Sequence, residues 1–426
     1  MKQGKYGEAV PVVIGGMVLD IQATSSIPPH PRTTCPGQVH YVQGGVARNI
    51  AECMGKLGTG PFFISVSGFD MAGTLLLEYW KSAKLPTEGI RRHQDIKTPT
   101  VCHILDVTGE VAAGVASVEA VEKFLTPEWI QQFKHMIRSA PILMVDANLS
   151  RPALEASCRL AAESNIPVWF EPVSIAKSKR IAPIVEYITF ASPNEDELIA
   201  MANALSSENL FCPIEKNKCS TDTLFQMLKP AIWLLLQKGV KVLVLTIGSE
   251  GVILCTKGEP NSWRIGLEKS HRHGFSQQLF ETMTSSSPSN WCTDSKVLER
   301  SPNFLAVHFP ALSASVVRLT GAGDCLVGGM LASLSAGLDV MQSVAIGIAA
   351  AKASVEVDSN VPSQFSLETI TVNGHSILQV MPRLYIQLPK LCNTNLSYNG
   401  QERGKRDASL NFLAVTISSF LSIHGN

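Results

Sequence analysis

The sequence predicts an α/β fold in which a mostly parallel central sheet carries helices on both faces and a small β layer lies beside it. From about residue 140, short apolar runs alternate with longer amphipathic segments. This alternation is typical of right-handed βαβ crossovers. Before residue 118, short apolar runs sit among polar residues and turns, which indicates a separate layer of strands.

The predicted central sheet begins with a strand at Val12–Ile14 that runs into two glycines. Further strands are expected at Ile142–Val145, Val168–Phe170, Tyr187–Phe190 and Val242–Ile247, with helices near residues 152–164, 175–185, 195–205 and 222–238. The small β layer is expected from parts of residues 17–43 and 96–120. Because ligands of open α/β sheets lie outside the carboxyl ends of the strands, this layer is expected to act as a lid.

One domain is expected to cover residues 1–383. Residues 257–303 are rich in Ser, His and Thr and predict a surface insertion of low order. The first part of residues 384–426 shows no clear periodicity of apolar residues, which predicts a C-terminal appendage.

Composition excludes several classes of protein. The 426 residues carry 36 Lys and Arg against 36 Asp and Glu, so a nucleic-acid partner is not expected. Uninterrupted apolar stretches stay well below 18 residues, so no membrane partner is expected either. The ten cysteines show no C-x-x-C pair and no zinc spacing, which predicts free thiols and a cytoplasmic protein.

The strongest local signal is RLTGAGDCLVGGMLASL at residues 318–334. Thr320–Gly323 form a glycine-rich turn, and a helix with a 3.6-residue apolar period follows. The first N–H groups of a helix carry a partial charge of about +0.5, so Gly321, Ala322 and Gly323 predict an anion hole for a phosphate. Half a charge cannot neutralise a triphosphate. Mg²⁺ is therefore expected, bound mainly through phosphates and waters.

Asp324 opens that helix and has two interpretations. A carboxylate in the first turn is favoured by the helix dipole for structural reasons alone. Beside a phosphate, it also suits the base that takes the proton from an attacking hydroxyl. A P-loop is excluded, because the one Gly-Lys pair, Gly55-Lys56, has Ile50 and Leu57 at the places of the leading glycine and the hydroxyl residue.

Over roughly residues 10–375 the chain resembles the PfkB, or ribokinase-like, carbohydrate and nucleoside kinases. The first signature of that family is matched at Gly44, Gly45, Ala47, Asn49, Ala51, Gly58 and Gly68, and the second at Gly321–Asp324. The resemblance implies a three-layer ribokinase-like fold, ATP as phosphate donor and Asp324 as catalytic base. It also implies that Gly321, Ala322 and Gly323 stabilise the charge that develops during transfer.

The resemblance also implies roles for other residues. Asp20, Gly44, Gly45 and Asn49 would face a ribose-like substrate. The nucleotide side would comprise Thr246, Gly248, Gly251, Thr320 and Asn194, with Asn194 and Glu197 acting on Mg²⁺. Structural alternatives stay open: Asp20 could cap a turn, Asn194 and Glu197 could cap a helix, and Asn49 could be a helix residue off the apolar stripe.

Within the family, GGVARNIAE, FEPVS and SPNEDEL are most similar to the pseudouridine kinases. This similarity implies transfer of a phosphoryl group to the 5′-hydroxyl of pseudouridine, with a homodimer formed through the lid. Ribose or another nucleoside is an alternative acceptor, because Val18 and Ser117 depart from the family pattern.

A nucleotide-binding pseudoenzyme is a further alternative, because Arg318 and Leu319 replace the usual residues before the second glycine turn. The guanidinium of Arg318 is expected to stand in for the monovalent cation that relatives hold there.

Overall fold

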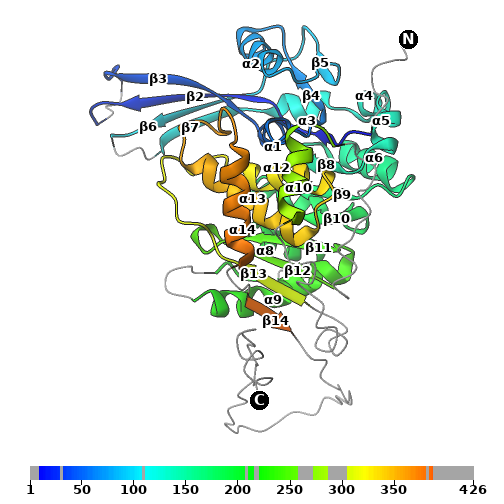
Figure 1. The fold of residues 1–426 in the computed structure, drawn as a ribbon. Helices are drawn as coiled ribbons and strands as arrows, with labels where there is room; N and C mark the ends of the chain where they lie inside the picture. Colours follow the sequence, from blue (N-terminus) through cyan, green and yellow to red (C-terminus); the bar gives the residue numbers. More distant parts are fainter. Residues whose placement is uncertain are drawn as a thin grey trace, which may run out of the picture.

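A computed structural model of the chain describes residues 9–28, 32–107, 111–206, 210–214, 220–257, 272–285, 305–379 and 383–386. These residues form a ten-stranded sheet that lies between two layers of helices, as Figure 1 shows. A second, four-stranded sheet is separate from it. Within these ranges, no helix is long and apolar enough to cross a membrane. The predicted α/β fold is therefore confirmed.

The ten-stranded sheet is parallel over most of its width. In spatial order its strands are β5 (Ile90–Arg92), β4 (Phe62–Ser67), β1 (Val12–Ile14), β8 (Leu143–Asp146), β9 (Val168–Glu171), β10 (Ile188–Ala191), β11 (Val242–Thr246), β12 (Val252–Thr256), β13 (Leu305–Phe309) and β14 (Arg383–Ile386). Neighbours from β5 to β11 are parallel, and β12 to β14 are each antiparallel to the strand before. Because β1 lies between β4 and β8, the strand order reverses at β1, where open α/β sheets bind ligands.

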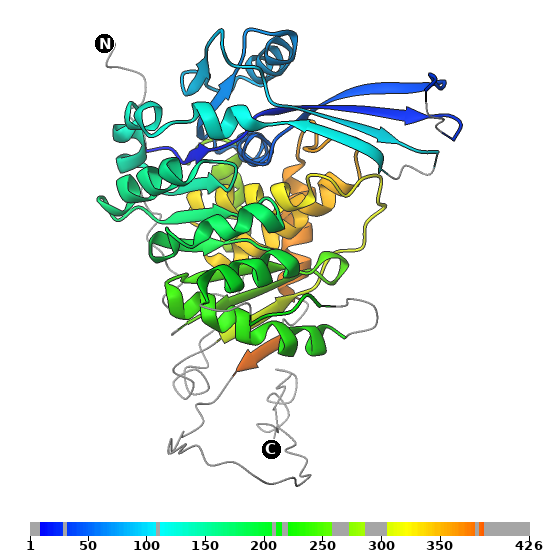
Figure 2. The same cartoon turned by 180° about the vertical axis from the view of Figure 1, so that it is seen from behind.

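Alternating side chains of the strands pack against the two helix layers. Val13, Phe63 and Met144 are buried on one face, and Val12, Phe62 and Leu143 on the other. Figure 1 shows the first layer, made of α1 (Val46–Lys56), α2 (Met71–Ser82), α10 (Phe275–Ser285), α12 (Ala322–Ser335), α13 (Val340–Val355) and α14 (Leu367–Gln379). Figure 2 shows the second, made of α3 (Glu119–Phe124), α4 (Pro127–Gln131), α5 (Lys134–Ser139), α6 (Arg151–Ala162), α7 (Ile175–Ser178), α8 (Glu195–Leu205) and α9 (Thr221–Lys238).

The four-stranded sheet projects from the body of the molecule in both views. Its order is β3 (Gly37–Gly44), β2 (Val18–Ser25), β6 (Thr100–Leu105) and β7 (Val111–Ser117). This is the small β layer that the sequence predicts. We call it the lid sheet.

The predicted helix at 175–185 is wrong in extent. The chain forms the short helix α7, a 3₁₀ turn at Lys179–Ile181 and a second 3₁₀ turn at Val185–Tyr187. Pro183 lies between the two turns. Proline lacks the N–H that a continuous helix needs and clashes with the preceding turn, which explains the break.

Two predictions about segments of the chain need correction, one about order and one about a boundary. Helix α10 lies inside the segment 257–303 that was expected to be of low order, and it buries Leu279 and Met283 completely in the core. Strand β14 crosses the predicted boundary at residue 384 and pairs with β13, because the free edge of β13 offers unpaired backbone groups. The remaining parts of both segments lie outside the described residues.

Candidate active site

The carboxyl ends of adjacent parallel strands place polar residues at one edge of the central sheet. Asp146 ends β8, Glu171 ends β9, and Thr246 ends β11. Asn194 follows β10 and forms an isolated bridge with Thr246. Asp146 and Glu171 were missed by the sequence reasoning, although an acidic residue directly after a buried apolar run is the signal that could have found them.

Helix α12 begins opposite this edge and brings Asp324 to it. Gly321, which precedes the helix, has φ 90°, and a Cβ there would lie 2.2 Å from the carbonyl oxygen of Asn360. Only glycine fits this backbone. No side chain of the N-cap residue, Gly321, occupies the first N–H groups of α12. A Cβ on Gly323 would meet open space. The helix N-terminus is thus built as the sequence predicts for an anion hole, and its role with a phosphate stays a prediction.

One hydrogen bond joins the two glycine turns. Asn49, in the first turns of α1, donates from Nδ2 to Oδ2 of Asp324 at 2.6 Å, across 275 residues of sequence. Asn49 is only 3% exposed. The side chain that the sequence leaves off the apolar stripe of α1 is therefore buried and bound to Asp324, because the N-terminus of α12 covers that side of α1.

The acceptor side of the site forms where β2 meets the first glycine turn. A Cβ on Gly44 would lie 2.2 Å from Oδ2 of Asp20. Gly45 has φ 98°, and a Cβ there would lie 2.5 Å from the carbonyl oxygen of Gly16. Both positions therefore need glycine for close approach. The structure brings Asp20, Gly44, Gly45 and Asn49 together, while their contact with a substrate stays a prediction.

Burial sets the electrostatics of the site. It raises the pKa of Asp324 to about 6, while the hydrogen bond from Asn49 and the charge of Arg48 lower that pKa, and Asp146 and Asp20 raise it. Burial also raises the pKa of Asp20, against the lowering effects of Asn360, His103, Arg48 and Arg318. A carboxylate whose pKa lies just below neutral pH is mostly ionised there and suits a general base.

Asn194 and Glu197 form a capping box, as their spacing predicts. Oδ1 of Asn194 accepts from the backbone N–H of Glu197, and Oε2 of Glu197 accepts from the backbone N–H of Asn194, both at 2.9 Å. This capping box begins α8. Capping does not exclude action on Mg²⁺, which stays a prediction.

The surrounding chemistry fits a cation bound loosely. Burial raises the pKa of Glu171 well above its ordinary range, and the charges of Glu197 and Asp324 add to this. Such repulsion among carboxylates is relieved by a nearby cation. Within the described ranges, no group of three or more His, Cys, Asp or Glu has the geometry to hold a metal. Hard oxygen donors without a cage suit Mg²⁺ held mostly by phosphates and waters.

Of the remaining nucleotide-side residues, Thr246 lies next to Asn194. Thr246 donates from Oγ1 to the carbonyl oxygen of Pro193 at 3.4 Å. Gly248 and Gly251 have φ 60° and 102°, and they frame a short 3₁₀ turn after β11. Thr320 is exposed beside the turn of Gly321. Their contact with a nucleotide stays a prediction.

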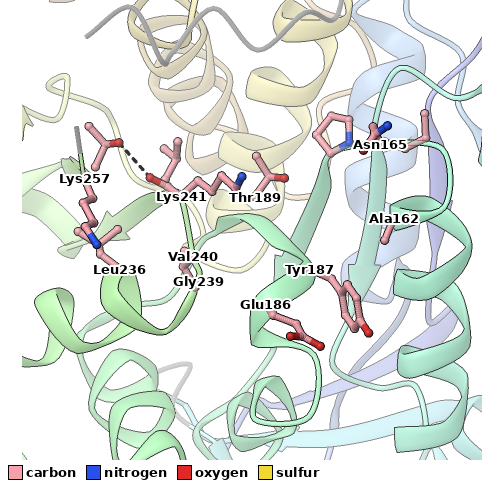
Figure 3. A pocket seen from close by; sticks show the side chains of 14 residues that line it. Ala162, Asn165, Glu186, Tyr187, Thr189, Leu236, Gly239, Val240, Lys241 and Lys257 are labelled. Atoms are coloured by element: carbon pink, nitrogen blue, oxygen red, sulfur yellow. Dashed lines mark hydrogen bonds between the residues drawn. The ribbon is translucent and has the colours of Figure 1, made fainter. Parts of the chain in front are cut away.

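A cavity of about 650 Å³ lies at the opposite edge of the central sheet, and the side chains that line it are drawn in Figure 3. Its lining includes Pro167, Tyr187 and Lys241, which precede β9, β10 and β11, and Thr256, which ends the antiparallel β12. These are the amino ends of the parallel strands. The cavity is therefore not part of the candidate active site.

The chain matches the family model of pfkB family carbohydrate kinases over residues 11–265 and 305–364. A pseudouridine kinase of Arabidopsis thaliana is 52% identical over 382 residues, which cover 87% of this chain and 98% of that relative. A pseudouridine kinase of Escherichia coli strain K12 is 26% identical over 59% of this chain and 74% of its own length. The structure of an Arabidopsis thaliana ribokinase complexed with ribose and ATP superposes with a TM-score of 0.64 at 17% identity, covering 86% of this chain and 99% of that one.

Replacement of Asp324 by Asn tests the electrostatics directly. The folded protein holds the pKa of Asp324 at about 6 instead of the ordinary 3.8, so the charged form destabilises the fold progressively as pH rises between these values. Asp324→Asn should therefore raise the free energy of unfolding by about 3 kcal/mol near pH 7.5 and by about half as much near pH 5. Turnover should fall by about 10²- to 10⁴-fold.

Denaturation curves at the two pH values and a phosphoryl-transfer assay measure both effects. Near-normal turnover, or a stability gain that does not change with pH, would contradict the assignment of Asp324.

Proposed function

The chain belongs to the pfkB family of carbohydrate kinases, and we propose that it transfers the γ-phosphoryl group of ATP to the 5′-hydroxyl of pseudouridine. The observation that carries the proposal is the position of Asp324, a carboxylate with a raised pKa at the start of α12 that is hydrogen-bonded to Asn49 of the acceptor side. The identity of 52% to the pseudouridine kinase of Arabidopsis thaliana supports the choice of acceptor.

The reaction needs one proton acceptor and one anion hole. Asp20, Gly44 and Gly45 hold the ribose, and the 5′-hydroxyl gives its proton to Asp324 as its oxygen forms a bond to the γ-phosphorus. The bond from that phosphorus to the β–γ bridging oxygen breaks, and ADP leaves with the electron pair. The N–H groups at the start of α12 stabilise the transferring group. Asn194 and Glu197 would hold Mg²⁺, which would supply positive charge to the phosphates when bound.

Unpaired polar atoms beside Asp20 support a nucleoside over a free sugar. Gln22 and His103 are neighbours on β2 and β6 of the lid sheet, and Arg318 donates to Oε1 of Gln22 at 2.9 Å. Among the described residues, Nδ1 of His103, Nη1 of Arg318 and Oδ1 of Asn360 are buried without a hydrogen-bond partner. All three side chains influence the pKa of Asp20. A planar base with several donors and acceptors would satisfy such atoms.

The uracil of pseudouridine is joined to ribose through carbon and keeps two N–H groups, whereas uridine keeps one. We expect pseudouridine to show the highest kcat/KM in a panel with uridine, cytidine and ribose. Uridine should be poorer by about 10²-fold or more, because a buried acceptor is left without its donor. The panel is measured with radiolabelled ATP and initial rates.

Two results of this panel would overturn the proposal. Equal use of ribose would assign the enzyme to free sugars, in line with the apolar side chain of Val18 at the start of β2. Binding of ATP without transfer to any acceptor would indicate a pseudoenzyme.

Arg318 lies three residues before the turn of Gly321 and is held by neighbouring groups. Its Nη2 lies 2.8 Å from Oδ1 of Asp358, its side chain is 17% exposed, and its backbone N–H donates to the carbonyl oxygen of Val355 at 3.2 Å. The fixed guanidinium would supply positive charge beside the turn of Gly321. It supports an enzyme that works without K⁺.

Exchange of K⁺ for tetramethylammonium should therefore change kcat/KM by less than about twofold, because the guanidinium is always charged. Arg318→Ala should lower kcat/KM in either salt. Activation of the unaltered enzyme by K⁺ of about tenfold or more would contradict this role of Arg318.

The outer face of the lid sheet supports a homodimer. Cross-strand register places Tyr41, Ile21, Cys102 and Val115 in one row, and Val39, Ala23 and Ile104 in the next. Val39, Tyr41, Ile104 and Val115 are between 43% and 74% exposed. Apolar sheet faces are commonly covered by a second sheet. We infer that the outer face of the lid sheet packs against the same face of a second copy of the chain.

Replacement of Val115 by Asp should convert the homodimer into monomers, because a charge buried between two apolar faces lacks a partner. Val372→Asp is the matched control, since Val372 is 57% exposed on α14, outside the lid sheet. Sedimentation velocity measures both variants. A monomeric unaltered protein, or a Val115→Asp variant that stays dimeric, would contradict the inferred interface.

A further inference from the structure

A row of buried charges lies along α1 behind the candidate active site. Arg48 and Glu52 are 2% and 1% exposed, and their side chains pair at 2.6 Å. Lys56 pairs with the other carboxylate oxygen of Glu52 at 2.5 Å, and the hydroxyl of Tyr79 also donates to Glu52. Buried ion pairs contribute little net stability, because both charges lose their hydration. A role beyond stability would explain their presence here.

Arg48 makes two hydrogen bonds to a single atom of Asn49. Its Nε donates to Oδ1 of Asn49 at 3.1 Å, and its Nη2 donates to the same oxygen. Because the amide oxygen is taken by the guanidinium, the amide nitrogen points the other way, where it donates to Oδ2 of Asp324 at 2.6 Å. The reverse orientation would set NH₂ against a cation and a carbonyl oxygen against a carboxylate.

We propose that Arg48 is a positioning residue, which fixes the amide of Asn49 so that Asp324 is held by one oxygen and presents the other to the acceptor hydroxyl. Glu52 holds Arg48 in turn, with support from Lys56 and Tyr79. The proposal rests on the proposed function, because it takes Asp324 as the base. It adds a residue that touches neither the acceptor nor ATP.

The orientation of the amide has an electrostatic consequence. Burial raises the pKa of Asp324, and Asp146 of β8 and Asp20 of β2 raise it as well. Glu171 of β9 also interacts with Asp324. The hydrogen bond from Asn49 and the charge of Arg48 lower the pKa of Asp324. Loss of the oriented amide would therefore leave Asp324 among carboxylates without its main hydrogen-bond donor, and the base would bind its proton more tightly.

The test compares Arg48→Lys with the matched control Lys56→Gln. Lysine at position 48 keeps the charge and can still pair with Glu52, but it lacks the planar fork that makes both bonds to Asn49. Lys56→Gln disturbs the same buried cluster without touching Asn49. Each variant is measured for thermal stability, for the KM of ATP, and for the dependence of kcat/KM on pH.

The positioning role makes distinct predictions for the two variants. Arg48→Lys should move the acidic limb of the pH profile of kcat/KM to higher pH, by about half a pH unit to one pH unit. It should also lower kcat by about tenfold and leave the KM of ATP unchanged. Lys56→Gln should lose stability but keep the limb of the unaltered enzyme. If both variants lose stability and neither moves the limb, Arg48 has a structural role only and the proposal is overturned.

Asn49→Asp keeps the proposal testable where Arg48→Lys does not fold. Aspartate still accepts from Arg48 but cannot donate to Asp324, so the acidic limb should rise by more than about one unit. An unmoved limb in a folded Asn49→Asp variant would overturn the proposal. Failure of the proposed function is a separate result: the unaltered enzyme would then show no acidic limb that disappears in Asp324→Asn.

Discussion

The hydrogen bond between Asn49 and Asp324 is the contact on which the candidate active site depends. It ties the start of α1 to the start of α12, so two glycine turns far apart in sequence meet at the carboxyl ends of the central strands. Burial at this junction brings the pKa of Asp324 to about 6. The same contact therefore fixes the geometry of the site and gives it a carboxylate suited to accept a proton near neutral pH.

The two proposed roles of the lid sheet, in acceptor recognition and in assembly, both rest on the alternation of its side chains. On β2 and β6, Gln22 and His103 belong to the face that meets the site, whereas Ile21 and Ile104 belong to the outer face. A one-residue shift of register would exchange the two faces. Contact with a second copy would therefore stabilise the strands that carry the polar groups around Asp20, and the two proposed roles of the lid sheet would support each other.

The sequence predicts five of the ten central strands, β1 and β8 to β11, together with the two glycine turns and the lid sheet, because each has a local signature in periodicity or turn chemistry. The placing of Asn194 and Thr246 on the nucleotide side comes from the family resemblance instead. The burial of Asn49 and of the Arg48–Glu52 pair could not be predicted, since it depends on α12 and α2 packing against α1. The order of α10 was also missed, because its polar sequence context hides two core residues, Leu279 and Met283.

A crystal structure with pseudouridine and a non-hydrolysable ATP analogue would show whether Asp324 faces both substrates. We expect the 5′-hydroxyl to lie within hydrogen-bonding distance of Oδ1 of Asp324, with Asn49 still on Oδ2 and the terminal phosphate at the start of α12. A 5′-hydroxyl bound out of reach of Asp324, or a terminal phosphate placed away from Gly321–Gly323, would contradict this expectation.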